Sequence, residues 1–188
     1  MIYNKKIIKA INMAYDAHKY QYDKIGVPYI FHPFKVAESI IEEESQFGGI
    51  KDCEALENCI IIALLHDVLE TKMNEYSGKD EFVQIHDGFY KCFGTKEEMV
   101  LFILRHIRIE FGDIVANGVE TITRKDGETY SDYIDRVCTN PYAVKVKIHD
   151  IKNNMNVNRM KLLDDKDKDS LSKRYMKAIE KLVKYERL

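Results

Sequence analysis

The sequence predicts an all-α protein, and three observations support this fold class. Apolar residues recur at steps of three and four over most of the chain, which is the period of an α-helix, and no segment shows the sustained two-residue alternation of a strand. No segment repeats another, and no linker rich in glycine, proline or serine divides the chain. Its 188 residues are enough for one hydrophobic core. We therefore expect a single domain, a helical bundle spanning residues 1–188.

The first helix is expected over residues 5–20, where apolar side chains form one stripe. A loop follows, with Gly26 and Pro28 as helix breakers. Pro33 suits the first turn of a second helix, where its missing N–H is not needed, and this places His32 at the N-cap. A lone histidine before a proline can also be a capping or packing residue, so His32 by itself does not indicate a site.

The most informative segment is residues 59–70. Its first seven residues are apolar without a break, which predicts a core helix that continues through Leu69. His66, Asp67 and Glu70 interrupt the apolar pattern and can share one face of that helix. Burying even a neutral polar group costs about 2–7 kcal/mol, and a metal ion is a common compensation for adjacent imidazole and carboxylate. The alternative is a helix that ends here with its last polar turn in solvent.

The rest of the chain is also predicted to be helical. Residues 71–95 are polar and irregular, with one short helix among their aromatic residues. Further helices are expected over residues 99–108, 112–123, 130–138, from Pro141 onward, and over 167–185. On the helix that begins at Pro141, Asp150 and Asn154 share one face. Its solvated side is expected to carry Lys145, Lys147 and His149.

Composition and charge exclude several classes of function. A net charge of −2, with no long run of one sign, argues against a broad nucleic-acid surface. The longest apolar runs are far shorter than the ~18–20 residues that cross a membrane. No apolar run follows the lysines near the N-terminus, so no signal peptide is expected. The four cysteines lack zinc-binding spacing and are expected to be free thiols in a reducing, cytoplasmic compartment.

Two imidazoles and two carboxylates stand out as candidate metal ligands. They are His32 at a helix start, the pair His66 and Asp67 in the core segment, and Asp150 on a late helix. Mixed nitrogen and oxygen donors suit a divalent first-row metal such as Mn²⁺, Fe²⁺, Co²⁺, Ni²⁺ or Zn²⁺. Four protein ligands leave positions open for a water and a substrate oxygen, so such a metal can acidify the water and polarise a phosphoryl group.

The ligand order H…HD…D in an all-α chain resembles the HD-domain phosphohydrolases. Three segments are similar to the hydrolase domain of RelA/SpoT-type alarmone enzymes, namely residues 26–33, 63–70 and 146–155. The resemblance runs from about residue 10 to 160, interrupted by an apparent insertion at about 76–104. It implies an HD-type helical bundle that removes pyrophosphate from the ribose 3′ position of (p)ppGpp, with Mn²⁺ as the expected metal.

The resemblance also implies roles for individual residues. Asp67 is both a metal ligand and part of the catalytic group, and Glu70 is the glutamate that orients or activates the attacking water. Lys24 matches a basic residue beside the nucleotide, and Asn154 matches a polar residue near the substrate ribose. The residue after Glu70 departs from the family pattern, because Thr71 stands where the family has an aspartate.

Two further departures concern nucleotide recognition. Asp23 replaces an expected arginine that contacts the guanine, and Asn156 replaces another arginine. An acidic residue cannot reproduce guanidinium stacking or phosphate pairing. Phosphate binding or base stacking is assigned to Arg124, Lys125, Tyr130 and Tyr133, with a solvated turn followed by a core-packing helix as the alternative.

Three functions remain open from the sequence. The first is a metal-dependent (p)ppGpp 3′-pyrophosphohydrolase, and the second is an HD phosphatase on nucleoside monophosphates or other phosphomonoesters. The third is a metal- and nucleotide-binding sensor without catalysis. The expected partner is a small-molecule nucleotide, neither a nucleic acid polymer nor a membrane. A homodimer contact is one use for the apolar residues of segment 76–104, and intramolecular packing is the other.

Overall fold

The computed structural model describes residues 5–23, 26–48, 50, 52–76, 82–86, 89–156 and 165–186. The all-α prediction is confirmed. The helices are α1 (Lys5–His18), α2 (Phe31–Phe47), α3 (Cys53–Leu65), α4 (Val68–Glu75), α5 (Lys96–Phe111), α6 (Asp113–Ile122), α7 (Tyr130–Val137), α8 (Pro141–Asn154) and α10 (Asp165–Leu182), followed by the 3₁₀ helix η1 (Val183–Tyr185). None of the described helices has both the length and the apolar character that crossing a membrane requires.

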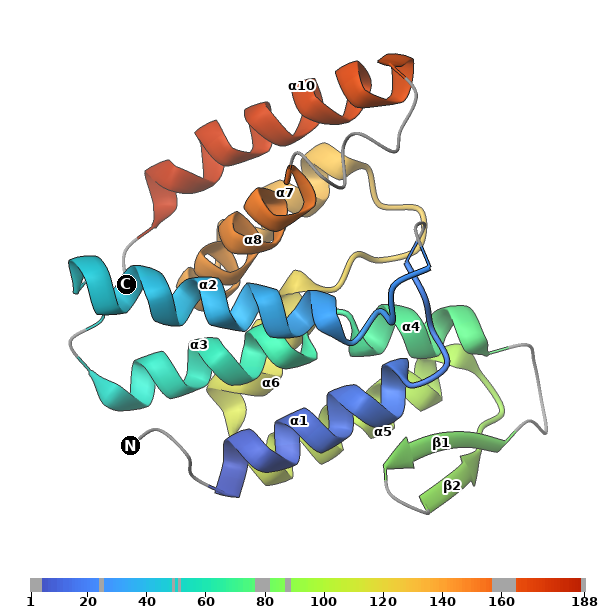
Figure 1. Cartoon of the computed structure of the whole chain (residues 1–188). Helices are drawn as coiled ribbons and strands as arrows, with labels where there is room; N and C mark the ends of the chain where they lie inside the picture. The colour runs from blue at the N-terminus through green and yellow to red at the C-terminus, as the bar shows by residue number, and fades with distance from the viewer. Residues whose placement is uncertain are drawn as a thin grey trace.

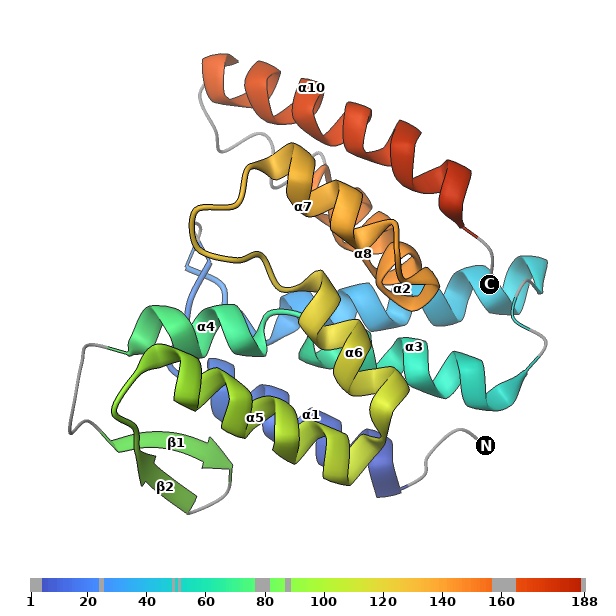
Figure 2. The same cartoon turned by 180° about the vertical axis from the view of Figure 1, so that it is seen from behind.

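Helix α3 is the centre of the bundle. It contacts α1, α2, α6 and α8, with α1 and α2 on the side that Figure 1 presents. Seen from behind, α6 covers the opposite face of α3, with α5 and α7 on either side of α6 (Figure 2). Because helices surround α3, its apolar run needs no polar face, and every residue from Cys59 to Leu65 is at most 3% exposed. Gly118 on α6 permits a close approach, since a Cβ there would lie 2.4 Å from Ile62 Cδ1 on α3.

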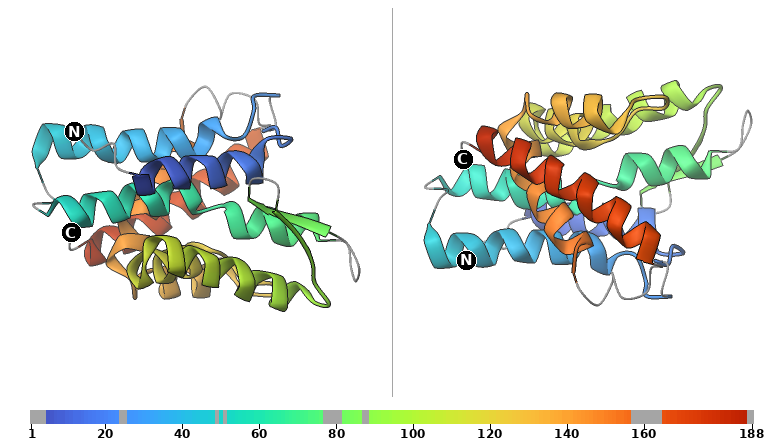
Figure 3. Two further views of the ribbon diagram at one scale, coloured as in Figure 1. Left: turned by 90° about the horizontal axis from the view of Figure 1, so that it is seen from below. Right: turned by 90° about the horizontal axis from the view of Figure 1, so that it is seen from above.

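Helix α8 crosses behind α2 and is itself covered by α10. The two views of Figure 3 place α1 and α10 on opposite sides of the bundle, with α10 crossing over α8. Pro141 occupies the first turn of α8, as predicted, and the Asn140 side chain caps it by accepting the N–H groups of Tyr142 and Ala143.

The predicted core helix over residues 59–70 is wrong in one respect. The helix ends at Leu65, and a new helix, α4, begins at Val68. Asp67 at this junction has φ −102° and ψ −2°, a bridge conformation that is sparsely populated and frequent at active sites. The break lets His66 and Asp67 point to a common centre from a helix joint.

The predicted short helix among the aromatic residues of 71–95 is also wrong. Residues Phe82–His86 and Phe89–Cys92 form an antiparallel hairpin, β1–β2, in which Phe82 pairs with Cys92. Both strands are rich in aromatic and β-branched residues, which favour an extended backbone. Phe93 after the hairpin is buried in the core, which agrees with intramolecular packing of this residue.

The expectation of a solvated side on α8 is wrong as well. Lys145 and His149 are buried, and the side chain of Lys147 is only 15% exposed. These side chains are buried because α2 packs on one side of α8, and α10 and η1 pack on the other. Charged side chains on this helix therefore take partners inside the protein.

Candidate metal centre

Three parts of the fold bring the four predicted ligand residues together. His32 lies in the first turn of α2, His66 and Asp67 form the joint between α3 and α4, and Asp150 lies in the last turns of α8. His32 Nε2 is 3.1 Å from Asp150 Oδ1, and His66 Nε2 is 3.1 Å from Asp67 Oδ2. The crossed distances are 3.7 Å from His32 Nε2 to Asp67 Oδ2 and 3.9 Å from His66 Nε2 to Asp150 Oδ1. One potential metal-ligating atom from each of His32, His66 and Asp150 lies within 4.8 Å of the other two.

The other nitrogens of both rings fix which atom faces the centre. His66 Nδ1 donates a hydrogen bond to the Ala63 carbonyl at 2.7 Å. His32 Nδ1 is assigned as the donor to Asn153 Oδ1, at 3.2 Å. In the neutral rings both Nε2 atoms therefore carry lone pairs. His66 Nε2 is buried and has no hydrogen-bond partner among the described residues. Two lone pairs and two carboxylates converge, and this donor set fits a divalent cation.

The electrostatics of the centre also favour a positive charge there. Burial alone would lower the pKa of His66, but the carboxylates of Asp67 and Asp150 raise it to about 9. Burial opposes ionisation of Asp67, yet His66 holds the pKa of Asp67 well below its ordinary range. Both shifts arise from the close approach of imidazole and carboxylate groups at one point.

Neighbouring side chains hold the two carboxylates in place. The Tyr29 hydroxyl donates to Asp67 Oδ2 at 2.6 Å. The Lys147 ammonium donates to Asp150 Oδ2 at 2.7 Å, and the Asn154 amide donates to Asp150 Oδ1 at 2.6 Å. Asn154, predicted as a substrate residue, is therefore tied to the metal centre in this structure.

The sequence analysis missed two of these neighbours, Tyr29 and Lys147. Lys147 lies three residues before Asp150 on one helix, and Tyr29 lies three residues before His32. The spacing of Lys147 was a usable signal, because residues three apart on a helix are neighbours. For Tyr29, which precedes its helix, no such signal exists.

Glu70 borders a cleft beside the centre. Burial, and then the negative charge of Asp67, raise the pKa of Glu70 above its ordinary value. Its Oε1 accepts the backbone N–H of Arg124 at 2.8 Å. A cavity of about 520 Å³ is lined by Glu70, Arg124, Lys125 and the loop that continues to Thr129. The segment that starts at Arg124 is thus part of the wall next to Glu70.

The other predicted substrate residues have different surroundings. The Arg124 guanidinium donates twice to the Glu128 carbonyl, at 3.1 and 2.7 Å, whereas Lys125 is exposed at the cleft. The hydroxyl of Tyr130 is buried without a hydrogen-bond partner in the described part of the chain, and Arg174 lies 4.7 Å above its ring. Tyr133 donates to the Ile122 carbonyl at 2.5 Å and is a core residue. Lys24 lies outside the described residues.

Two of the three departures from the family pattern, Thr71 and Asp23, have side-chain partners in the structure. Thr71 is buried, and its hydroxyl lies 3.2 Å from Gln21 Oε1 and 3.4 Å from His18 Nδ1. Asp23 Oδ1 accepts the Val27 N–H at 2.9 Å and so closes the loop before α2. Both residues support the polypeptide around the site.

Comparisons with known proteins agree with this architecture. No family model matches the chain. The curated guanosine-3′,5′-bis(diphosphate) 3′-pyrophosphohydrolase of Haemophilus influenzae is 36% identical over 114 residues, covering 52% of this chain and 15% of that protein. The chain thus matches only a small part of that relative's length.

A solved structure provides the similarity in fold. It is described as a metazoan orthologue of SpoT that hydrolyses ppGpp and plays a role in starvation responses. The two structures superpose with a TM-score of 0.64 at 18% sequence identity, covering 96% of this chain and 86% of the other. The chain therefore shares the all-α fold of that structure, and part of its sequence is similar to a guanosine-3′,5′-bis(diphosphate) 3′-pyrophosphohydrolase.

Proposed function

We propose that the chain is a metal-dependent phosphohydrolase that removes the 3′-pyrophosphate from (p)ppGpp. The observation that carries the proposal is the convergence of two imidazole nitrogens and two carboxylates on one point, with His66 Nε2 buried there and without a hydrogen-bond partner in the described chain. Similarity to proteins named for this reaction supports the choice of substrate.

His32, His66, Asp67 and Asp150 would hold the metal, with Mn²⁺ as the first choice and Fe²⁺, Co²⁺, Ni²⁺ or Zn²⁺ as alternatives. A bound divalent ion supplies Lewis acidity and makes a coordinated water more acidic. Glu70 takes the proton of the attacking water. Its raised pKa suits this role, because a general base works best when its pKa approaches the working pH.

The reaction adds water across one P–O bond. The water oxygen attacks the phosphorus attached to the ribose 3′ oxygen, and the bond between that phosphorus and the 3′ oxygen breaks. The 3′ oxygen leaves with a proton as a hydroxyl group, and pyrophosphate is released. Lys147 donates to Asp150, and Lys125 lines the cleft beside Glu70. Positive charge at these two positions suits an anionic substrate.

The substrate is proposed to enter along the cleft beside Glu70. Arg124 and Lys125 would face its phosphates there. Tyr130 would approach from the side of α7 with its hydroxyl, which has no hydrogen-bond partner among the described residues. Asn154 and Lys24 complete the proposed nucleotide contacts. A cytoplasmic location agrees with the four cysteines, all of which are free thiols.

A second candidate is a phosphatase acting on nucleoside monophosphates or other phosphomonoesters. It is favoured by Thr71, whose hydroxyl lies against Gln21 and offers no second carboxylate, and by Asp23, which cannot pair with a phosphate. The same two residues support the non-catalytic sensor, because both weaken the expected catalytic and nucleotide-binding groups.

The test is a turnover assay of the Mn²⁺-loaded protein with ppGpp beside a panel of nucleoside mono-, di- and triphosphates, resolving pyrophosphate from orthophosphate. Pyrophosphate released from ppGpp in multiple turnovers is the expected result. Orthophosphate from the panel, without ppGpp turnover, would favour the phosphatase. Tight nucleotide binding without any turnover, across several divalent metals, would favour the sensor.

A further inference from the structure

We propose that Tyr29 is a positioning residue of the metal centre, whose phenol hydroxyl holds the Asp67 carboxylate so that one oxygen faces both imidazoles. This inference rests on the proposed metal binding and goes beyond the predicted ligand set. It concerns how firmly the metal is held, whatever nucleotide the protein hydrolyses.

The contact that carries the inference is short and involves the oxygen nearest to both histidines. Tyr29 Oη donates to Asp67 Oδ2 at 2.6 Å. The same Oδ2 is 3.1 Å from His66 Nε2 and 3.7 Å from His32 Nε2. Hydroxyl-to-carboxylate bonds of about 2.5–2.7 Å are charge-assisted and stronger than neutral ones. Tyr29 therefore fixes the oxygen that would contact the metal.

Asp67 needs such a neighbour more than the other three residues do. Its side chain is 19% exposed, against 5% for His32 and Asp150 and 2% for His66. Lys147 and Asn154 both donate to Asp150, while among the described residues Tyr29 is the one hydroxyl or amine that donates to Asp67.

Tyr29 is itself held in a fixed place. Its N–H donates to the Gln21 carbonyl at 2.8 Å, and its carbonyl accepts the His32 N–H at 2.8 Å. Its ring lies 5.2 Å from the ring of His18, which is 1% exposed, and 5.5 Å from that of His32. A ring packed between two buried imidazoles presents its hydroxyl at little cost in side-chain entropy. The loop from Gln21 to Tyr29 and the metal centre are thereby joined.

Two other roles for the hydroxyl predict different behaviour. If only the ring mattered, as packing, removing the oxygen would change neither metal binding nor catalysis. If the phenol acted on the substrate, removing it would slow turnover without changing the affinity for metal. A positioning role predicts weaker metal binding in the absence of any nucleotide.

The experiment is Tyr29→Phe, which keeps the ring and removes only the oxygen. Mn²⁺ affinity is measured by calorimetry on the nucleotide-free protein, together with the Mn²⁺ electron paramagnetic resonance spectrum. We expect affinity to fall about 10–100-fold, the range for lost partners of metal ligands. The melting temperature of the metal-free protein should stay close to that of the wild type.

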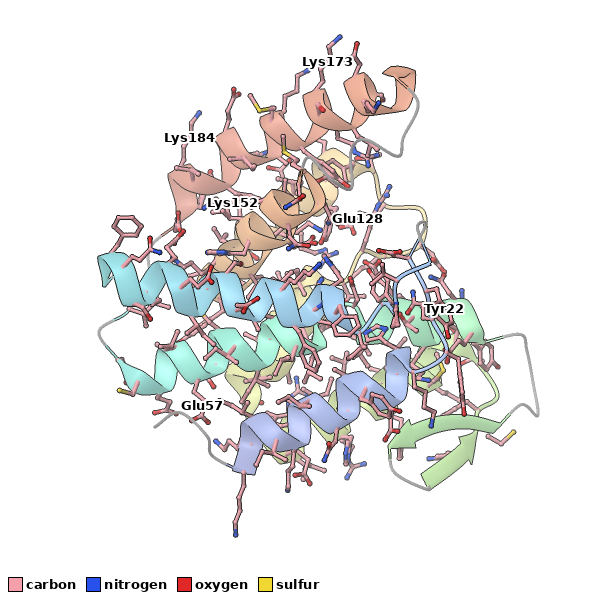
Figure 4. All side chains as sticks on the ribbon, in the orientation of Figure 1. Tyr22, Glu57, Glu128, Lys152, Lys173 and Lys184 are labelled. Atoms are coloured by element: carbon pink, nitrogen blue, oxygen red, sulfur yellow. The ribbon has the colours of Figure 1, made fainter. Side chains whose placement is uncertain are left out.

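Tyr22→Phe is the matched control. It makes the same change in the same loop, on a side chain that is 63% exposed and is labelled in Figure 4. Its Mn²⁺ affinity should equal that of the wild type. Wild-type affinity in Tyr29→Phe would overturn the inference, whether or not turnover changes. If the wild-type protein binds Mn²⁺ but releases no pyrophosphate from ppGpp, the proposed function is wrong. The role of Tyr29 in metal binding is still tested in that case, because Mn²⁺ affinity is measured without any nucleotide.

Discussion

The two ends of the α2–α8 contact each bury a polar cluster, and the clusters differ in how their charges are balanced. At one end, α2 and α8 contribute His32 and Asp150 to the candidate metal centre. At the other end they contribute Glu43, Glu44 and Lys145, joined by Glu186 after η1, and we call these four residues the lysine cluster. The same pair of helices therefore allows a direct comparison.

The lysine cluster contains its own cation. Lys145 Nζ contacts the carboxylates of Glu43, Glu44 and Glu186, the last two at 3.2 Å. Although burial opposes it, hydrogen bonds from Lys145 and charges nearby lower the pKa of Glu43 to about 2. An ammonium among carboxylates satisfies them without any added ion. This cluster joins α2, α8 and the C-terminal residues.

In the candidate metal centre the Lys147 ammonium donates to Asp150 Oδ2. The other carboxylate oxygen of Asp150 converges with Asp67 Oδ2 and the Nε2 atoms of two histidines. An unpartnered nitrogen alone does not make the difference, because His149 Nε2 beside the lysine cluster is also buried without a partner in the described chain. That nitrogen lies 3.5 Å from Glu43 Oε1, which Lys145 already contacts. The comparison indicates that two imidazole nitrogens converging with two carboxylates distinguish the candidate metal centre from a cluster of carboxylates built around one lysine.

The largest expected effect comes from Asp67→Asn. Losing one charged ligand should remove bound Mn²⁺ and lower turnover by about 10³-fold or more, since a metal supplies several kcal/mol of transition-state stabilisation. Metal content and pyrophosphate release are measured together. Glu43→Gln makes the same kind of change in the lysine cluster and should keep both. An active, metal-free Asp67→Asn protein would remove the metal mechanism.

The next effect separates metal binding from catalysis. Glu70→Gln should keep Mn²⁺ and lower turnover by about 10²–10⁴-fold, the usual contribution of a general base. In the wild type the rate should rise with pH as Glu70 loses its proton. Because its pKa is raised, this rise should be centred above the ordinary range of a glutamate. The variant should lack the rise, and an unchanged pH–rate profile would exclude Glu70 as the base.

A third prediction concerns the lysine cluster alone. Lys145→Met should destabilise the fold by about 3–5 kcal/mol, because it leaves the buried carboxylate of Glu44 and the partly buried one of Glu43 without their cation. Lys152→Met is the control, since Lys152 is 53% exposed and pairs with the same Glu43 (Figure 4), and it should cost less than about 1 kcal/mol. Denaturant unfolding gives both values. Equal effects of the two variants would contradict the contrast between the clusters.

The smallest expected effect is at the cleft. Lys125→Ala should raise KM for ppGpp by about tenfold or less with kcat nearly unchanged, as expected for one exposed ionic contact with a phosphate. Steady-state kinetics separate the two constants. A large fall in kcat with unchanged KM would instead place Lys125 next to the reacting phosphate.

Much of the fold could be predicted because the signals for helices are local. The unbroken apolar run of α3 predicts a central helix, and the order of His32, His66, Asp67 and Asp150 predicts one site. The joint between α3 and α4 could not be predicted, since the apolar pattern continues through Leu69 on both sides of it. The burial of Lys145 and Lys147 could not be predicted either. Helical periodicity indicates which residues share a face of a helix, but not which other helix packs on that face.

The most direct test of the central claim is anomalous diffraction from crystals of the Mn²⁺-loaded protein. A single strong peak is predicted within bonding distance, about 2.0–2.3 Å, of His32 Nε2, His66 Nε2 and the carboxylates of Asp67 and Asp150. No peak is predicted at the lysine cluster. A manganese peak elsewhere, or full occupancy by Mn²⁺ without contact to these four residues, would contradict the account.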